Sequence, residues 1–170
     1  VYKRQIEHRV RAAGVFTDRD RILLVCHRDP DHGDEWWIPP GGRVEPADHS
    51  LFDTARREIF EETGLVAQLS RIIYIREFRE HPTRTYHLEL FMAVDSYAGE
   101  LTITNIPEGD LDYGIVRDVQ WLKRSELEGL VVWPEWLRED WFWQDAADGF
   151  PETRYTGMSH DPVDPRDTGE

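Results

Sequence analysis

The stretch RREIFEETG, Arg56–Gly64, carries three glutamates, Glu58, Glu61 and Glu62, immediately before a glycine. If the stretch is helical, these carboxylates crowd the electronegative C-terminal end of the helix, where negative charge is unfavourable. Glu58 and Glu62 are also spaced i,i+4, at which like charges on a helix repel each other. The three glutamates therefore do not help folding, which indicates a different role.

The residues around this stretch predict a helix that begins after Ser50 and runs to about Glu62. The sequence SLFD gives Ser50 the N-cap position and Asp53 the third helical position, as in a capping box. Gly64 supplies the stop, because helices commonly end at a glycine in the left-handed conformation.

On a helical wheel of about 100° per residue, the apolar side chains fall within one arc that would face the core. They are Leu51, Phe52, Ala55 and Ile59. Glu62 falls inside this arc, Glu58 at its edge and Glu61 just beyond it. A solvated acidic patch, which is the alternative interpretation, would avoid the apolar arc.

A divalent cation would turn the unfavourable interactions of these carboxylates into favourable ones. Mg²⁺ and Mn²⁺ prefer oxygen ligands, and glutamates spaced i, i+3 and i+4 can converge on one or two such ions. Arg57 can pair with Glu61 at i,i+4 and hold it in place. The turn PPGG, Pro39–Gly42, brings bare backbone close to the acids and favours the same interpretation.

The longer segment GGRVEPADHSLFDTARREIFEETGL, Gly41–Leu65, resembles the Nudix box. That family pattern is a glycine, five residues, a glutamate, seven residues and then Arg-Glu-aliphatic-any-Glu-Glu-any-Gly-aliphatic. REIFEETGL, Arg57–Leu65, matches the second half at every position, and Gly42 matches the opening glycine. The recognised box therefore spans Gly42–Leu65.

One part of the box departs from the family pattern. Asp48 stands where the pattern has glutamate, and eight residues instead of seven separate it from Arg57. We infer a one-residue insertion near Ala47–His49, in a loop before the helix, which leaves the geometry of the glutamates intact. Asp48 itself is interpreted as peripheral.

The resemblance implies an α/β fold, the Nudix-type α/β/α sandwich with a mixed β-sheet, as a hydrolase domain over residues 1–148. Residues 149–170 are rich in proline, glycine and acidic side chains and predict a C-terminal tail or extended arm. Within the domain, His8–Phe16 and Arg21–Arg28 read as a hairpin. A C-terminal helix is predicted from Pro134 to about Asp148.

The resemblance also implies Mg²⁺- or Mn²⁺-dependent hydrolysis of a small molecule, a nucleoside diphosphate linked to another moiety. Glu58 and Glu62 are the implied principal metal ligands. Glu61 is implied as a ligand or as the base that activates water, and the Gly41 carbonyl as a further ligand. Arg57 is implied to orient the glutamates.

Many members of the family supply another acidic residue from a loop beyond the box. The loop PEGDLDYG offers Glu108, Asp110 and Asp112. We select Glu108 as the further catalytic candidate, with plain solvation of the loop as the alternative interpretation.

Two groups outside the box could contact a substrate. Trp36 and Trp37, just before the glycine-rich turn, can stack on a base or pack in the core. A set of basic residues can meet phosphate or simply balance nearby glutamates. The set is Arg71, Arg76, Arg79, His81, Arg84 and His87.

Composition narrows the possible partners and compartment. The formal net charge of −14 over 170 residues disfavours nucleic acid and anionic membrane as partners. A single cysteine, Cys26, permits no intrachain disulfide, and no long apolar run predicts a membrane span, so we expect a cytoplasmic protein.

Alternative functions and the assembly state follow from the same resemblance. A diphosphate isomerase of the superfamily would need a cysteine in the site, and Cys26 in an apolar strand fits this poorly. A non-hydrolysing ligand sensor usually lacks box glutamates, which this chain keeps. A homodimer is compatible with the sequence, which does not specify the nucleotide, the number of metal ions or the general base.

Overall fold

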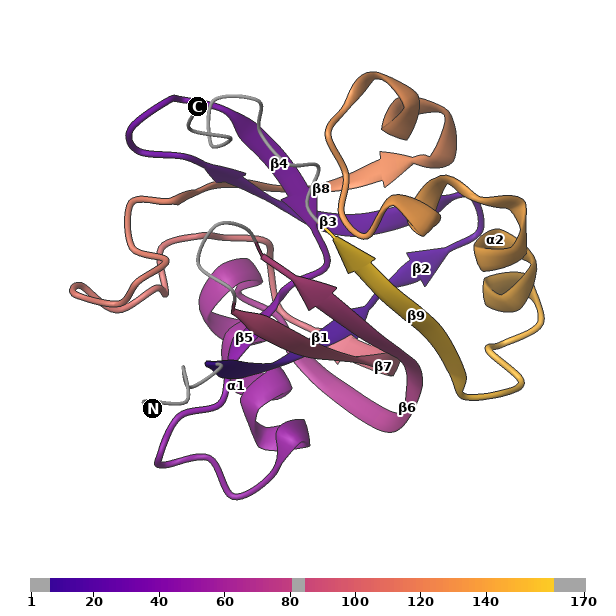
Figure 1. The fold of residues 1–170 in the computed structure, drawn as a ribbon, viewed down its shortest axis with the longest axis horizontal. Helices are drawn as coiled ribbons and strands as arrows, with labels where there is room; N and C mark the ends of the chain where they lie inside the picture. Colours follow the sequence, from indigo (N-terminus) through magenta and orange to yellow (C-terminus); the bar gives the residue numbers. More distant parts are fainter. Residues whose placement is uncertain (1–6, 81–84, 161–170) are drawn as a thin grey trace, which may run out of the picture.

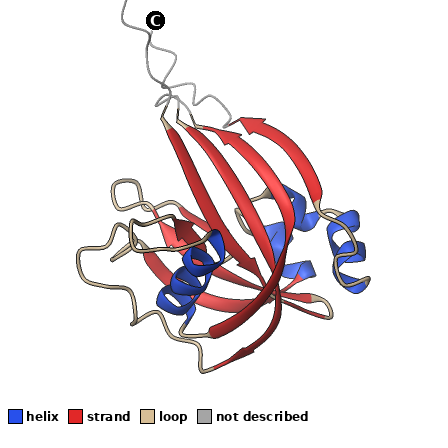
Figure 2. Cartoon of the chain, turned by 90° about the horizontal axis from the view of Figure 1, so that it is seen from below, coloured by secondary structure: helices blue, strands red, loops and turns tan. Residues whose placement is uncertain are grey.

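The computed structural model describes residues 7–80 and 85–160. Figure 2 shows helices on either side of a body of strands. One side carries α1 (Leu51–Thr63), and the other carries the C-terminal helical segments, including α2 (Asp140–Ala147) (Figure 1). This arrangement confirms the predicted α/β sandwich.

The larger of two sheets is mixed, as predicted. Its strands are β1 (His8–Val15), β5 (Gly41–Arg43), β6 (Val66–Arg79), β7 (Tyr86–Ala98) and β9 (Arg154–His160). They lie in the order β5-β1-β7-β6-β9. β1 is antiparallel to β5 and parallel to β7, whereas β6 is antiparallel to β7 and parallel to β9. The glycine-rich β5 therefore lies directly beside the small residues of β1.

The second sheet is built around β3 and is antiparallel. Its strands are β2 (Thr17–Asp18), β3 (Arg21–Arg28), β4 (Glu35–Ile38) and β8 (Val116–Lys123). The predicted hairpin of His8–Phe16 with Arg21–Arg28 is wrong, because β1 and β3 belong to different sheets. Both edges of β1 are taken by β5 and β7, so β3 pairs with the short β2 instead.

The predicted C-terminal helix is divided into two parts. A 3-10 turn, η2 (Glu135–Arg138), precedes α2, and Glu139 between them is extended, with φ −72° and ψ 145°. A further 3-10 segment, η1 (Arg124–Gly129), follows β8. The break allows Trp136 of η2 and Phe142 of α2 to enter the same core, where their ring centroids lie 5.6 Å apart.

The sheet continues beyond residue 148, where the sequence predicted the folded domain to end. β9 lies along β6 and closes that side of the sheet (Figure 1). Asp145 of α2 accepts hydrogen bonds from Tyr74 and from Arg154, which ties α2 to both strands. Part of the expected tail is thus a strand, because its backbone completes the edge of β6. Residues 161–170 lie outside the described part of the chain.

None of the helices in residues 7–80 and 85–160 combines the length and the apolar character needed to cross a membrane.

Candidate active site

Helix α1 begins and ends where the sequence predicted. The Ser50 side chain accepts a hydrogen bond from the Asp53 N–H, and Gly64 ends the helix with φ 76°. The apolar face of α1 packs into the core. Ile59 on this face and Ala12 of β1 are both fully buried in the same cluster. The wheel prediction is confirmed, since Glu62 is 1% exposed and lies on the buried face.

Glu62 is fixed from the backbone of the glycine turn. Its Oε2 accepts a hydrogen bond of 2.8 Å from the Gly41 N–H. Its Oε1 is buried and has no hydrogen-bond partner among the described residues, although His27 Nε2 lies 3.3 Å away. One oxygen of Glu62 is thus held and the other is left for a ligand.

Glu58 lies against the second glycine of the turn. A Cβ added at Gly42 would come within 2.3 Å of the Glu58 carboxyl carbon. Only glycine therefore lets this carboxylate sit under the turn. Glu58 is 6% exposed and faces a cavity that is also lined by Gly41 and Gly42.

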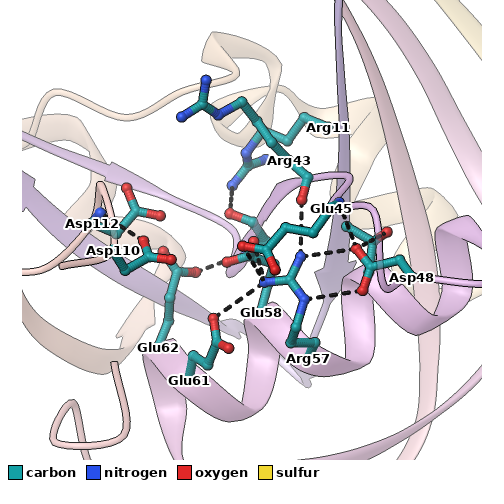
Figure 3. Close-up of polar contacts among 12 residues, drawn as sticks. Arg11, Arg43, Glu45, Asp48, Arg57, Glu58, Glu61, Glu62, Asp110 and Asp112 are labelled. Carbon is teal, nitrogen blue, oxygen red and sulfur yellow. Dashed lines mark hydrogen bonds and ion pairs between the residues drawn. The ribbon is translucent and has the colours of Figure 1, made fainter. Parts of the chain in front are cut away.

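Arg57 connects the acidic side chains (Figure 3). Its Nη1 donates to Glu58 Oε1 at 2.9 Å and to Glu61 Oε2 at 3.3 Å. Its Nη2 donates to the Arg43 carbonyl at 2.9 Å, and the same guanidinium pairs with Asp48. The predicted pairing of Arg57 with Glu61 is present, and a wider network surrounds it.

Asp48 is not peripheral, contrary to the interpretation from the sequence. Its side chain is 5% exposed, and it accepts hydrogen bonds from Arg57, from the Thr54 hydroxyl at 2.8 Å and from the Glu45 N–H at 2.8 Å. Hydrogen bonding from Arg57 is the main reason that the pKa of Asp48 lies below its usual range. The loop that departs from the family spacing thus supplies the anchor of Arg57.

Burial makes the charged forms of the box glutamates costly. Burial, followed by the nearby charge of Glu62, raises the pKa of Glu58 to about 8, although Arg57 acts in the opposite direction. Burial also raises the pKa of Glu61. Two carboxylates so placed carry a large unfavourable interaction unless a proton or a cation compensates it.

The acidic loop contributes residues other than the one selected. Glu108 is exposed and does not line the cavity, whereas Asp110 and Asp112 do. Burial, followed by the charge of Glu62, raises the pKa of Asp112. The structure brings Asp110 and Asp112 to the box glutamates (Figure 3) and leaves Glu108 in solvent.

The cavity has a volume of about 710 Å³, and part of its wall is cationic. The basic residues that line it are Arg9, Arg11, His27, Arg43 and His87. Arg11 Nη2 donates to the carbonyls of Pro39 and Gly41, at 2.7 and 3.0 Å. In a chain of net charge −14, this local group suits an anionic ligand whose other side meets the acids.

His27 is a site residue that the sequence analysis missed. It is 5% exposed, and its ring stacks on Trp36 with the centroids 5.7 Å apart and an interplanar angle of 18°. Its position at the end of the apolar run RILLVCHR was a usable signal, since a buried ionisable residue at a strand end requires a partner. Here the nearest carboxylate is that of Glu62, whose Oε1 lies 3.3 Å from His27 Nε2.

The oxygen donors of the site suit a hard divalent cation, although in this structure several of them are hydrogen-bonded to arginine side chains. Among the residues that the structure describes, no group of three or more His, Cys, Asp or Glu side chains is already arranged to hold a metal ion. Arg57 engages Glu58 and Glu61, and Arg11 engages the Gly41 carbonyl. The unpartnered Glu62 Oε1 beside the buried Glu58 is what an oxygen-preferring cation would satisfy.

Comparison with curated proteins finds short matches. Over 76 residues the chain is 38% identical to human nucleoside diphosphate-linked moiety X motif 6, and over 68 residues it is 41% identical to rat diphosphoinositol polyphosphate phosphohydrolase 2. These matches cover 44% and 39% of this chain. The chain spans only 23% and 35% of the length of these two relatives.

Solved structures share the whole fold. A NUDIX hydrolase from Nitrosomonas europaea superposes with a TM-score of 0.67 at 18% identity, covering 88% of this chain and 93% of that one. A MutT protein from Bacillus halodurans gives 0.61 at 19% identity, covering 89% of each chain. The family profile of the NUDIX domain matches residues 7–144. The chain therefore belongs to the Nudix hydrolase family.

Proposed function

We propose that this chain is an Mg²⁺- or Mn²⁺-dependent pyrophosphohydrolase that cleaves the phosphoanhydride bond of a nucleoside diphosphate linked to another moiety. The observation that carries the proposal is the burial of Glu58 and Glu62 side by side beneath a cavity whose other residues include five basic side chains. A diphosphate with its cation has the charge pattern that such a cavity would neutralise.

Each box residue has its own role in the proposed reaction. Glu58 and Glu62 would hold the cation, with Glu61 able to join them. When bound, the cation would neutralise phosphate charge and lower the pKa of a coordinated water molecule. Arg57 binds one oxygen of Glu61, so the other carboxylate oxygen can accept the proton of the attacking water. Asp112, with its raised pKa, is a second candidate for this proton.

The basic residues would bind the phosphates and orient the bond to be cleaved. Arg9, Arg11 and Arg43 line the cavity from β1 and β5, next to the glycine turn. Guanidinium groups make charge-assisted hydrogen bonds to phosphate oxygens and fix their geometry. Water then attacks phosphorus, the phosphoanhydride bond breaks, and a nucleoside monophosphate or similar fragment leaves.

The names of both relatives refer to diphosphate compounds, which supports a diphosphate substrate for this chain. One relative is named for nucleoside diphosphate-linked moieties and the other for diphosphoinositol polyphosphates. An isomerase of the same superfamily fits less well, because Cys26 is buried, is absent from the cavity lining and has a pKa raised to about 11, chiefly by burial. A sensor that binds without hydrolysis remains the competing function.

A hydrolysis screen tests the proposal. The full chain is incubated with Mg²⁺ and with a panel of nucleoside diphosphate sugars, dinucleoside polyphosphates and nucleoside triphosphates, and the released products are separated. We expect cleavage of at least one substrate class, and Glu62→Gln should abolish it in a folded protein. Glu128→Gln, at an exposed glutamate outside the site, is the matched control. Full activity in folded Glu62→Gln would contradict the assignment.

A further inference from the structure

A second cavity, of about 500 Å³, opens beside the first. The two share four lining residues, Arg11, Trp36, Ile38 and His87, and so form one continuous cleft. The first cavity contains Glu58, Asp110 and Asp112 together with most of the basic residues. The second cavity is lined by other residues, which indicates that it binds a different part of the ligand.

The second cavity is partly walled by flat aromatic rings. Trp36, Phe78 and Trp133 line it, and none of the three is fully buried. Trp36 lies at the boundary, because its ring stacks on His27 next to Glu62 and also lines both cavities. Partly exposed aromatic rings in a cleft provide faces on which a planar heterocycle stacks.

Several of the charged groups in the same cavity are paired with one another. Arg76 is 5% exposed, and its Nη1 donates to Glu89 Oε2 at 2.5 Å. Arg76 Nη2 is buried and has no hydrogen-bond partner among the described residues, and the Glu135 carboxylate lies 3.5 Å from it. His87 Nε2 lies 3.2 Å from Glu80 Oε2. Two guanidinium groups, of Arg11 and Arg76, and two carboxylates, of Glu80 and Glu89, thus line the cavity without an excess of positive charge.

We propose that this second cavity binds the base of a nucleoside, with the ring against Trp36 and the base edge toward Arg76 and Glu89. This inference rests on the proposed function, since the diphosphate would occupy the first cavity. A purine edge offers both N–H donors and ring acceptors, which match a carboxylate and a guanidinium. A polyphosphorylated ring matches poorly, because the carboxylates of Glu80 and Glu89 balance the guanidinium groups of Arg11 and Arg76 and leave no net positive charge for additional phosphates.

Binding of ligands with and without a base tests the inference apart from hydrolysis. AMP and GMP share their phosphate with ribose 5-phosphate and differ from it by the base. In calorimetric titrations of the full chain, we expect both nucleotides to bind about 10-fold or more tightly than ribose 5-phosphate, the gain expected from one stacked base. Equal affinities for the three ligands, or no measurable binding of either nucleotide at millimolar concentration, would contradict the proposal.

Variants locate the binding site. Trp36→Ala should weaken AMP binding about 10-fold and leave the weaker binding of ribose 5-phosphate unchanged. Trp36→Phe should keep most of the affinity for AMP, and it serves as the test if Trp36→Ala does not fold. Tyr97→Ala is the matched control, at an exposed aromatic residue of β7 roughly 30 Å along the strand from His87. Unchanged AMP affinity in folded Trp36→Ala would overturn the inference.

The two proposals fail in different ways. If no diphosphate is hydrolysed but AMP binding depends on Trp36, the proposed activity is wrong and the base site stands. If hydrolysis occurs but its KM is the same for nucleoside and non-nucleoside diphosphates and does not change in Trp36→Ala, the base site is wrong and the activity stands.

Discussion

Arg57 and Asp48 form a two-pronged ion pair, in which Nε donates to Oδ1 at 3.1 Å and Nη2 donates to Oδ2 at 2.9 Å. Arg57 then reaches Glu58 and Glu61 through its remaining nitrogen, Nη1. The aspartate that interrupts the family spacing thus positions the guanidinium that positions the glutamates.

Replacing this aspartate should impair the site more than the fold. Asp48→Asn removes the charge of a buried partner, so we expect unfolding free energy to fall by about 1–3 kcal/mol. Hydrolysis should fall about 10-fold or more, as is usual when a group that orients metal ligands is lost. Urea denaturation and steady-state kinetics measure the two effects. Asp53→Asn, which removes an exposed ion pair with Arg56 and one negative charge from the first turn of α1, should cost less than about 1 kcal/mol and preserve activity.

The stability of the metal-free protein should decrease as pH rises from about 4.5 to about 8. Burial and Glu62 raise the pKa of Glu58 from 4.5 to about 8. Between these values the folded protein keeps a proton that the unfolded chain has released, so the free energy of unfolding falls with increasing pH. In denaturation series with EDTA, Glu58→Gln should flatten this slope and Glu128→Gln should retain it. An equal slope in folded Glu58→Gln would assign the effect to other groups.

Mg²⁺ should stabilise the folded chain, because a cation between Glu58 and Glu62 offsets the cost of burying carboxylates side by side. At about 100 times its dissociation constant, an ion that binds only the folded state adds about 2.7 kcal/mol to the unfolding free energy. Thermal unfolding with and without Mg²⁺ measures the effect, which does not depend on any substrate. Glu62→Gln should lose the shift and Glu128→Gln should keep it. The same shift in both variants would place the ion elsewhere.

Adding one methyl group to the glycine turn should displace Glu58. In Gly42→Ala the new Cβ would lie 2.3 Å from the carboxyl carbon of Glu58, so that carboxylate must move away from the turn. We expect a loss of about 1–3 kcal/mol in stability, as for other overpacked sites, and weaker Mg²⁺ binding. Gly129→Ala places its methyl group in open space and serves as the control. Wild-type Mg²⁺ affinity in Gly42→Ala would show that Glu58 is not a ligand.

The sequence predicted the helix of the site because local signals and burial agree there. Ser50 caps α1, Gly64 ends it, and the wheel places Glu62 on the buried face. These features depend on residues close in the chain, which a single sequence displays directly. The family pattern added the fold, and the mixed sheet and the two helical layers confirm it.

Features that depend on distant pairing were not predicted. Nothing local in His8–Phe16 reveals that β7, far along the chain, takes the edge of β1 that a hairpin would use. The loop sequence alone does not show which of Glu108, Asp110 and Asp112 turns toward the site, and the structure places Asp110 and Asp112 there. The same holds for His27, whose partner stands on α1.

The small residues of β1 limit which substitutions the core beside the site can accept. Ala12 and Ala13 lie opposite Gly42 and Gly41, and the atoms of Ala12 and Ala13 already fill the space in which a Gly41 side chain would lie. A larger residue at Ala13 would push the turn outward and lengthen the bond from the Gly41 N–H to Glu62. The volume of an apolar residue in the core thereby sets the position of the Glu62 carboxylate beneath the cavity. Changes to the core in this strand are constrained by catalysis as well as by packing.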